Sequence, residues 1–221
     1  MIKPIGIIET PFKQKLGIPR QSLLSPSAKG EIILSHEFRR EDCLRELDTF
    51  SHLWILFLFS EANSWRTTIS PPKLRGQKRI GVFATRSPHR PNHIGMSVLK
   101  LDRICEQNII HVSGVDLLDQ TPILDIKPYI PKWDSVSEAN QGWMDNYQDQ
   151  SLEVVFSLDS SSQMLLDQNL ELKNLLIETL ASDPRPTNLL NEKVFKQQIL
   201  GFDIHWHFNE DHIVVNYISQ P

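Results

Sequence analysis

The chain is poor in cysteine and has no long apolar run. Its two cysteines, Cys43 and Cys105, lie far apart and show no metal-ligand spacing. This argues against a disulfide framework and favours two reduced thiols. The longest apolar run, from Leu53 to Phe59, is too short to span a bilayer, and the first residues lack the apolar core of a signal peptide. We therefore expect a soluble, cytoplasmic protein with no membrane segment.

Several common motifs are also missing. No glycine-rich phosphate loop and no G-x-G-x-x-G follows a strand, which argues against a Rossmann-type cofactor site. No nucleophile elbow of a hydrolase is present. His89 and His93 have a spacing that could bind zinc on a helix, but Pro88 and Pro91 exclude that helix. We expect no metal.

Acidic residues are absent between Ala62 and Leu101, although the net charge of the whole chain is −4. The same stretch contains eight basic residues: Arg66, Lys73, Arg75, Lys78, Arg79, Arg86, Arg90 and Lys100. Uncompensated positive charge in one segment of an acidic protein creates a local field that suits phosphate groups. A solvated basic loop without a partner is an equal alternative on charge alone.

Short alternating apolar segments dominate what is present. They predict strands at residues 3–9, 30–34, 52–59, 80–84, 96–103, 109–115 and 123–129. Many short strands with little helix indicate a barrel or a curled sheet. One short helical pattern covers residues 39–47.

The C-terminal part has a mixed pattern. Strands are predicted at 152–158, 202–208 and 212–218, and one amphipathic helix at 163–180. We expect a mainly β protein with an N-terminal β-barrel domain, residues 1–140, and a small α+β C-terminal domain, residues 150–221.

Polar groups are concentrated in two segments that follow strands, Arg86 to Gly95 and Asp116 to Tyr129. Three aspartates of the second segment are compatible with a two-carboxylate or magnesium site. The alternative is structural: Asp119 can cap a turn, and Asp125 can pair with Lys127 or with an arginine of the first segment.

These segments carry a family resemblance. The segment Gly81 to Gly95 resembles the signature of the TrmO (TsaA-like) family, and Asp116 to Tyr129 resembles its second signature. The segments Ile5 to Lys13, Phe50 to Trp54 and Asp183 to Pro186 are similar to further motifs of the family. The likeness covers essentially the whole chain.

Two residues depart from the family pattern. His93 stands where proline is common, which predicts a less rigid loop, and Gln120 stands where glycine is common. We expect at Gln120 either a turn without a positive φ or a glutamine held in a strained one.

The resemblance implies a β-barrel methyltransferase that acts as a homodimer and uses S-adenosyl-L-methionine (SAM). It implies a tRNA substrate whose adenine next to the anticodon already carries a threonylcarbamoyl group on N6. A non-catalytic tRNA-binding module or a SAM-binding regulatory protein of the same fold is the alternative.

The resemblance also assigns cofactor-binding positions. They are Pro11, Phe12, Lys13, His52, Leu53, Arg86, Met96, Val115, Asp116 and Leu117. Arg86 has the strongest side-chain case because SAM carries a carboxylate; a structural ion pair is its alternative role.

Catalytic candidates follow from the chemistry of this substrate. The N6 nitrogen is a poor nucleophile with an acidified N–H, so a base would help, and Asp119 or Asp125 are candidates. Tyr129 is a candidate for stacking or hydrogen bonding, and Arg90 or Lys127 for holding the threonyl carboxylate.

Overall fold

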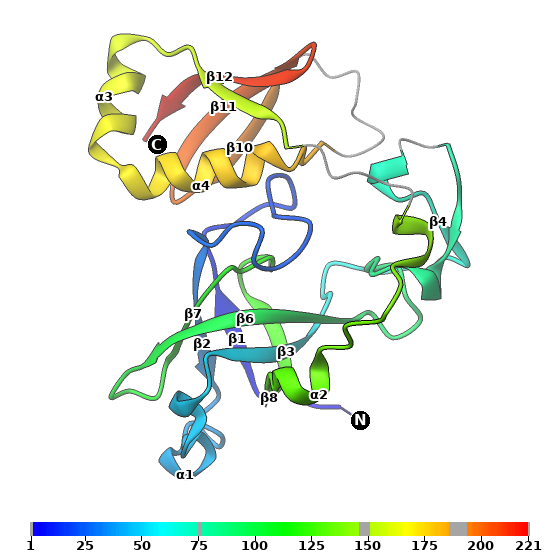
Figure 1. The fold of residues 1–221 in the computed structure, drawn as a ribbon. Coiled ribbons are helices and arrows are strands. Elements are labelled where there is room, and N and C mark those ends of the chain that lie inside the picture. The colour runs from blue at the N-terminus through cyan, green and yellow to red at the C-terminus, as the bar shows by residue number, and fades with distance from the viewer. Residues whose placement is uncertain (1, 75–76, 146–150, 186–193, 221) are drawn as a thin grey trace.

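The computed structural model describes residues 2–74, 77–145, 151–185 and 194–220 (Figure 1). A closed barrel forms the N-terminal part, and a four-stranded sheet with two helices forms the C-terminal part. The predicted mainly β fold with an N-terminal barrel is confirmed. No helix of these ranges combines the length and the apolar character that crossing a membrane requires.

Six strands close the barrel in the order β1-β2-β7-β6-β3-β8, and all neighbours are antiparallel. Their bounds are β1 (Gly6–Glu9), β2 (Lys29–Leu34), β3 (His52–Leu58), β6 (Ile94–Ile104), β7 (Ile110–Ser113) and β8 (Thr121–Pro128). Closure leaves no free edge strand in this sheet. Six short strands can therefore form a stable sheet.

The alternation of apolar residues decides which face points inward. In β3, Leu53 and Ile55 are fully buried in the barrel, whereas His52, Trp54 and Leu56 are half-buried on the outer face. Val115, just after β7, is also fully buried.

The connection between β3 and β6 contains the hairpin of β4 (Thr68–Ile69) and β5 (Ile80–Gly81) and the 3-10 turns η2 (Pro72–Leu74) and η3 (Val82–Ala84). The strand predicted at 80–84 stops at Gly81, because the following residues tighten into η3. Arg75 lies outside the described residues.

Four further short elements lie on the barrel or follow it: α1 (Glu41–Leu44), η1 (Leu47–Thr49), α2 (Pro131–Asp134) and η4 (Gly142–Met144). The helix predicted at 39–47 is thus reduced to four residues. Leu44 is the one buried residue of α1, so there is no broad apolar stripe for a longer helix to bury.

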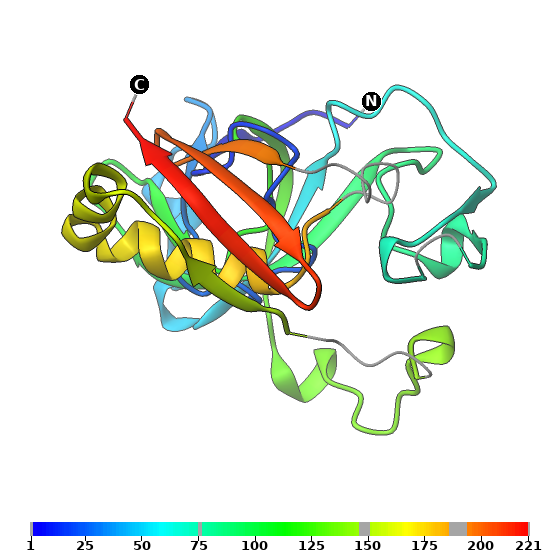
Figure 2. The same ribbon diagram turned by 90° about the horizontal axis from the view of Figure 1, so that it is seen from above.

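The C-terminal sheet has the order β10-β11-β12-β9, with β9 parallel to β12 and the other pairs antiparallel. Its elements are β9 (Glu153–Phe156), α3 (Ser160–Gln168), α4 (Leu170–Ala181), β10 (Phe195–Ile199), β11 (Phe202–Asn209) and β12 (His212–Ser219). Both helices lie against one face of the sheet (Figure 2). The single helix predicted at 163–180 is broken at Asn169, whose side chain donates to the carbonyl of Leu165 at 2.8 Å.

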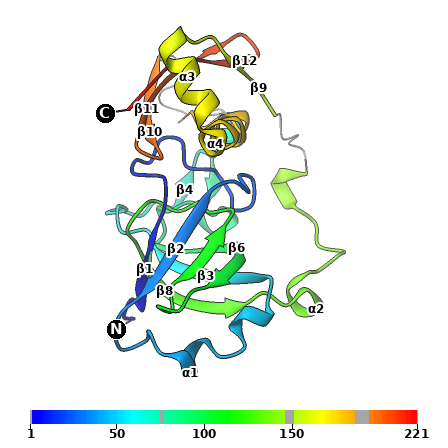
Figure 3. The same ribbon diagram turned by 90° about the vertical axis from the view of Figure 1, so that its left-hand side faces the viewer.

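The chain after β1 connects the two parts (Figure 3). Phe12, 1% exposed, forms an isolated antiparallel bridge with Ile199 at the end of β10. The backbone N–H and the hydroxyl of Ser27 both donate to the carboxylate of Glu178 in α4, at 2.9 and 2.8 Å. Apolar residues of both parts belong to one continuous buried cluster.

Candidate active site

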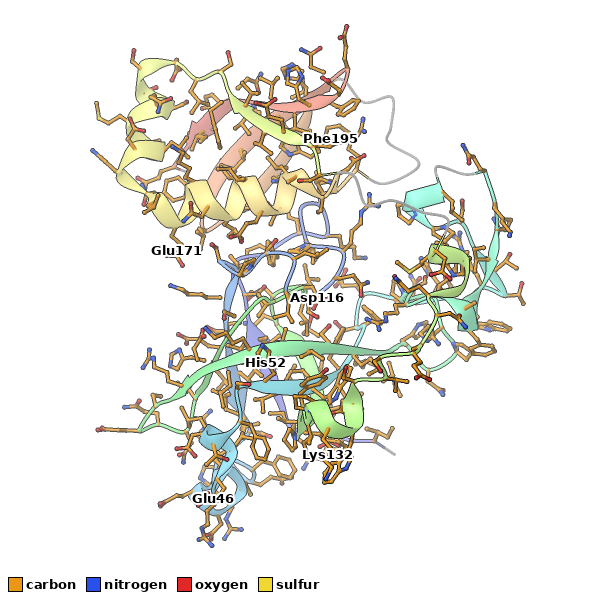
Figure 4. All side chains as sticks on the ribbon, in the orientation of Figure 1. Glu46, His52, Asp116, Lys132, Glu171 and Phe195 are labelled. Carbon is orange, nitrogen blue, oxygen red and sulfur yellow. The ribbon has the colours of Figure 1, made fainter. Side chains whose placement is uncertain are left out.

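A cavity of about 560 Å³ opens at the end of the barrel. Its walls come from the loop after β1, the end of β3, the loop before β6 and the segment between β7 and β8. Five of the predicted site residues line it: Arg86, Arg90, Met96, Asp116 and Leu117. Its volume suits a small organic ligand. Asp116 lies at the end of the barrel that faces the C-terminal sheet (Figure 4).

Asp116 places a shielded carboxyl group in this cavity. One of its oxygens, Oδ1, is out of contact with solvent and accepts no hydrogen bond from the described residues. Burial raises the pKa of Asp116 to about 6, against hydrogen bonds from Ser97 and from the backbone of Asp116 and Ser22 and against the nearby charge of Arg86. Asp116 lines the cavity, and a carboxyl group with an unsatisfied oxygen is suited to a ligand that donates a hydrogen bond or carries positive charge.

Replacing Asp116 by asparagine is expected to stabilise the ligand-free protein near neutral pH by up to about 3 kcal/mol. The rise of the pKa from 3.8 to about 6 is about two units, each worth about 1.4 kcal/mol. Between these values the native carboxyl keeps a proton that the unfolded chain has lost. Its contribution to stability is therefore complete below about pH 4 and is lost as the pH rises through about 6.

Urea unfolding of wild type and Asp116→Asn across this range measures the effect. The gain should shrink toward zero as the pH approaches about 4. Asp48→Asn, at an exposed position, is the matched control and should show little change. A stability difference for Asp116→Asn that is the same at every pH would contradict the assignment.

The loop after β1 forms a wall that the sequence did not reveal. Pro19, Arg20 and Gln21 line the cavity, and Gln21 accepts a hydrogen bond from the guanidinium of Arg86 at 2.9 Å. Arg20 donates to the backbone carbonyls of Asp183 and Arg185. The C-terminal part thereby holds the loop that positions Arg86.

Arg90 holds the turn that precedes it. Its Nη1 donates to the carbonyl of Val82 at 3.1 Å and to that of Thr85 at 2.6 Å. The guanidinium thus fixes η3 while it lines the cavity. Both of its hydrogen bonds within the described residues come from Nη1.

His93 and Gln120, the two departures from the family pattern, both have a left-handed backbone, with φ of 50° and 61°. Gln120 is therefore the strained alternative of the two that the sequence left open. A proline cannot adopt the φ of His93. The backbone carbonyl of His93 accepts from Phe59 at 2.8 Å, and its ring nitrogen Nδ1 lies 2.9 Å from the carbonyl oxygen of Pro88.

Other predicted residues share the outer face of the barrel next to the cavity. Met96 of β6 and Asp125 of β8 are the cross-strand partners of Leu56, and Leu56 and Met96 line the cavity. Adjacent strands are about 4.8 Å apart, so Asp125 lies one strand beyond the cavity wall. The carboxylate of Asp125 forms a 2.9 Å ion pair with Lys127, and both side chains are half-exposed or more.

His52 and Tyr129 lie farther along the same face. The backbone N–H of Tyr129 donates to the carbonyl of His52, and their rings meet edge-on with centroids 6.4 Å apart. The ring of Trp54 lies 5.7 Å from that of Tyr129. In this structure these residues do not line the cavity.

The remaining predicted residues have structural surroundings. The carboxylate of Asp119 accepts from the backbone N–H of Thr10 at 2.9 Å and pairs with Lys13 at 2.7 Å. Pro11 and Phe12 are buried in the same turn, and Leu53 and Val115 are in the barrel interior. None of these side chains lines the cavity.

No group of three or more histidine, cysteine, aspartate or glutamate side chains in the described ranges is arranged to hold a metal ion. Ser97, which binds Asp116, was also missed by sequence reasoning. The alternation in β6 could have identified it, because Ser97 is a polar residue on the same inward face as Leu99 and Leu101.

The sequence matches known families along nearly its whole length. Residues 7–135 match the tRNA-methyltransferase O N-terminal domain, and residues 149–221 match the TrmO C-terminal domain. The chain belongs to the tRNA-methyltransferase O family. The resemblance recognised in its signature segments is confirmed.

Comparisons with individual members of the TrmO family support this assignment. The chain is 39% identical over 212 residues to the Escherichia coli protein named tRNA (adenine(37)-N6)-methyltransferase, covering 91% of this chain and 90% of that one. It is 39% identical over 215 residues to a Pseudomonas aeruginosa protein named putative S-adenosylmethionine-dependent methyltransferase RcsF, covering 94% and 92%. A crystal structure of TrmO from P. aeruginosa superposes with a TM-score of 0.81 at 35% identity, covering 100% of this chain and 97% of that one.

Proposed function

We propose that this chain is a cytoplasmic, SAM-dependent methyltransferase that methylates N6 of adenine 37 in tRNA already carrying a threonylcarbamoyl group there. The observation that carries the proposal is that the signature segments of the TrmO family meet at one cavity. Arg86 comes from the first segment and Asp116 from the second, and both line that cavity.

The residues present fit SAM. The cofactor carries a carboxylate, an ammonium and a sulfonium group, and it supplies a methyl group from the sulfonium. Arg86 offers a guanidinium for the carboxylate, whereas the unpartnered oxygen of Asp116 offers an acceptor for a positively charged or hydrogen-bonding group. Leu117 and Met96 add apolar walls.

For the transfer step we propose that positioning supplies most of the acceleration, on the scale of about 7–11 kcal/mol. Arg90 lies in the cavity, where both hydrogen bonds of its guanidinium within the described residues come from Nη1, and it is assigned to the threonyl carboxylate. Asp125, one strand from the cavity wall, is assigned to accept the N6 proton. Lys127 holds the Asp125 carboxylate in place through their ion pair, and Tyr129 is assigned to contact the adenine ring. Asp119 positions the turn at Thr10 instead.

The outer face of β3, β6 and β8 supports a homodimer. The residues Trp54, Leu56, Met96 and Val98 form an apolar area on it, and Met96 is 48% exposed. This area adjoins the cavity through Leu56 and Met96. A second copy packed there would cover this apolar surface beside the cavity mouth.

The variant Met96→Glu is expected to convert the dimer into monomers, because a charge would be buried in the apolar contact. Light scattering over a range of protein concentrations measures the mass. Glu138→Gln, at an exposed position outside this face, is the control. A monomeric wild type, or a Met96→Glu protein that remains dimeric, would remove this face from the interface.

The function is tested by mass spectrometry of tRNA nucleosides from a strain that lacks the gene. Loss of the N6-methyl group from threonylcarbamoyladenosine, restored by the wild-type gene, is the expected result. An unchanged nucleoside profile would favour the tRNA-binding module or the SAM-binding regulator. We further propose that residues 150–221 form a domain that holds the cavity loop and contributes to tRNA binding.

A further inference from the structure

Phe83 is the most exposed of the large apolar side chains in the described residues, with 79% of its surface accessible. It lies in η3 between Val82, which is buried, and Ala84, which is exposed, at the start of the signature segment. A phenylalanine left in water forgoes a burial contribution of about 1.5–3 kcal/mol. A single exposed apolar side chain is common on protein surfaces, so the surroundings of the ring decide its role.

The turn that carries Phe83 is firmly held. Arg90 donates to the carbonyls of Val82 and Thr85, at 3.1 and 2.6 Å. The indole N–H of Trp143 donates to the carbonyl of Ala84 at 2.8 Å. The backbone that carries the exposed ring is therefore already ordered before a partner binds, and binding need not order it.

The surroundings of the ring are positively charged. The guanidinium of Arg90 lies 5.9 Å from the centre of the Phe83 ring, and Arg90 also lines the cavity. The basic segment continues into the β4–β5 hairpin, which projects to one side of the barrel (Figure 1), where Arg79 is fixed to Thr68 by two hydrogen bonds of 2.8 Å. Trp65, which is 56% exposed, is a second exposed aromatic ring in the segment between Ala62 and Leu101 that lacks acidic residues.

Exposed aromatic rings among arginines and lysines are the arrangement with which proteins bind single-stranded nucleic acid. The cations contact phosphates, and the rings stack on unpaired bases. A flat base fits the uncovered face of Phe83, and the target adenine of an anticodon loop has unpaired neighbours on both sides.

We propose that Phe83 is a stacking platform for an unpaired RNA base adjacent to the adenine that is methylated. The proposal rests on the proposed function, because it takes the substrate to be the anticodon loop of a tRNA. It adds a specific contact to the diffuse charge of the basic segment: Phe83 holds the loop at the cavity rim while the target base enters.

The test uses the full-length protein and a synthetic anticodon stem–loop whose target adenine carries the threonylcarbamoyl group. Phe83→Leu removes the flat ring and keeps an apolar side chain, and it is expected to raise the Kd for the stem–loop about 5- to 100-fold. Phe83→Trp should keep wild-type affinity. The salt dependence should stay unchanged in both variants because no phosphate contact is lost, whereas Lys78→Ala, with an exposed lysine, should flatten it.

A second readout locates the stack. In stem–loops carrying 2-aminopurine immediately 5′ or 3′ of the target adenine, one label should change its fluorescence on binding wild-type protein and not on binding Phe83→Leu. An unchanged Kd for Phe83→Leu overturns the proposal, and so does a loss of SAM affinity or a change of molecular mass, which assigns the ring to the cofactor or to a second copy. A wild-type protein that binds the stem–loop no better than an unrelated hairpin overturns the proposed function itself.

Discussion

Replacing Arg185 by leucine is expected to lower the free energy of unfolding by about 3–5 kcal/mol, the cost of removing one partner of a buried ion pair. Arg185 is only 5% exposed. Its guanidinium donates to both carboxylate oxygens of Asp183, at 2.6 and 2.9 Å, and lies 3.6 Å from the centre of the Phe208 ring. Burial alone would raise the pKa of Asp183, but the hydrogen bonds and charge of Arg185 outweigh it, so this pKa is held below its usual value.

Thermal unfolding measures this loss, at about 2–4 °C of Tm per kcal/mol for a chain of this size. Arg45→Leu is a matched control, because Arg45 pairs with Asp42 at the surface and its loss should cost at most about 1 kcal/mol. The double variant Asp183→Asn/Arg185→Leu should recover part of the stability, since the carboxylate that Arg185 neutralised is removed with it. A Tm for Arg185→Leu equal to that of the control would show that the pair does not stabilise the fold.

The substitution Arg185→Leu should also alter the wall of the cavity. Arg20 binds the carbonyls of Asp183 and Arg185, and Gln21 beside it binds Arg86. Displacing the 183–185 turn therefore releases the wall that orients Arg86. Pro186, the last residue of the motif that contains this turn, lies outside the described residues.

The barrel could be predicted from sequence because each strand alternates between an interior and an exterior face. That pattern is local, as in β3, where Leu53 and Ile55 are buried and His52 and Trp54 are not. The helix breaks were not predictable from periodicity, since a single asparagine side chain at position 169 ends α3. β10 was missed because its buried positions include a glutamine, Gln197, which is 3% exposed.

The site was predictable where a contiguous segment builds it. Arg86 and Asp116 come from the two signature segments and meet at one cavity. Arg20 and Gln21 come from a loop without any motif, and only the closure of the barrel and the contact with the C-terminal part bring them there. Asp119 was predicted from residue type, and type alone cannot show that its carboxylate already binds Thr10 and Lys13.

The largest expected effect is that of the threonylcarbamoyl group of the substrate on the rate of methylation. One tRNA with and without the threonylcarbamoyl group on its adenine should differ in the rate of methylation by about 100-fold or more. A site built around polar partners rejects a substrate that lacks them, by up to about 10⁴–10⁵-fold. Without the group, the guanidinium of Arg90 in the cavity lacks its anion. The carboxylate of Asp125 would then face a plain aromatic amine, whose proton it removes poorly.

Single-turnover methylation with labelled SAM, on both forms of one tRNA, measures this ratio. The binding of both forms is measured beside it, so that a lost rate can be separated from lost affinity. Asp125→Asn should lower the rate on the modified form and leave the poor rate on the bare form nearly unchanged, because the base serves only the acidified N–H. Equal rates on the two forms would contradict both the assignment of Arg90 and that of Asp125. The 2.9 Å contact between Asp125 and Lys127 would then be a structural ion pair on the barrel wall with no role in catalysis.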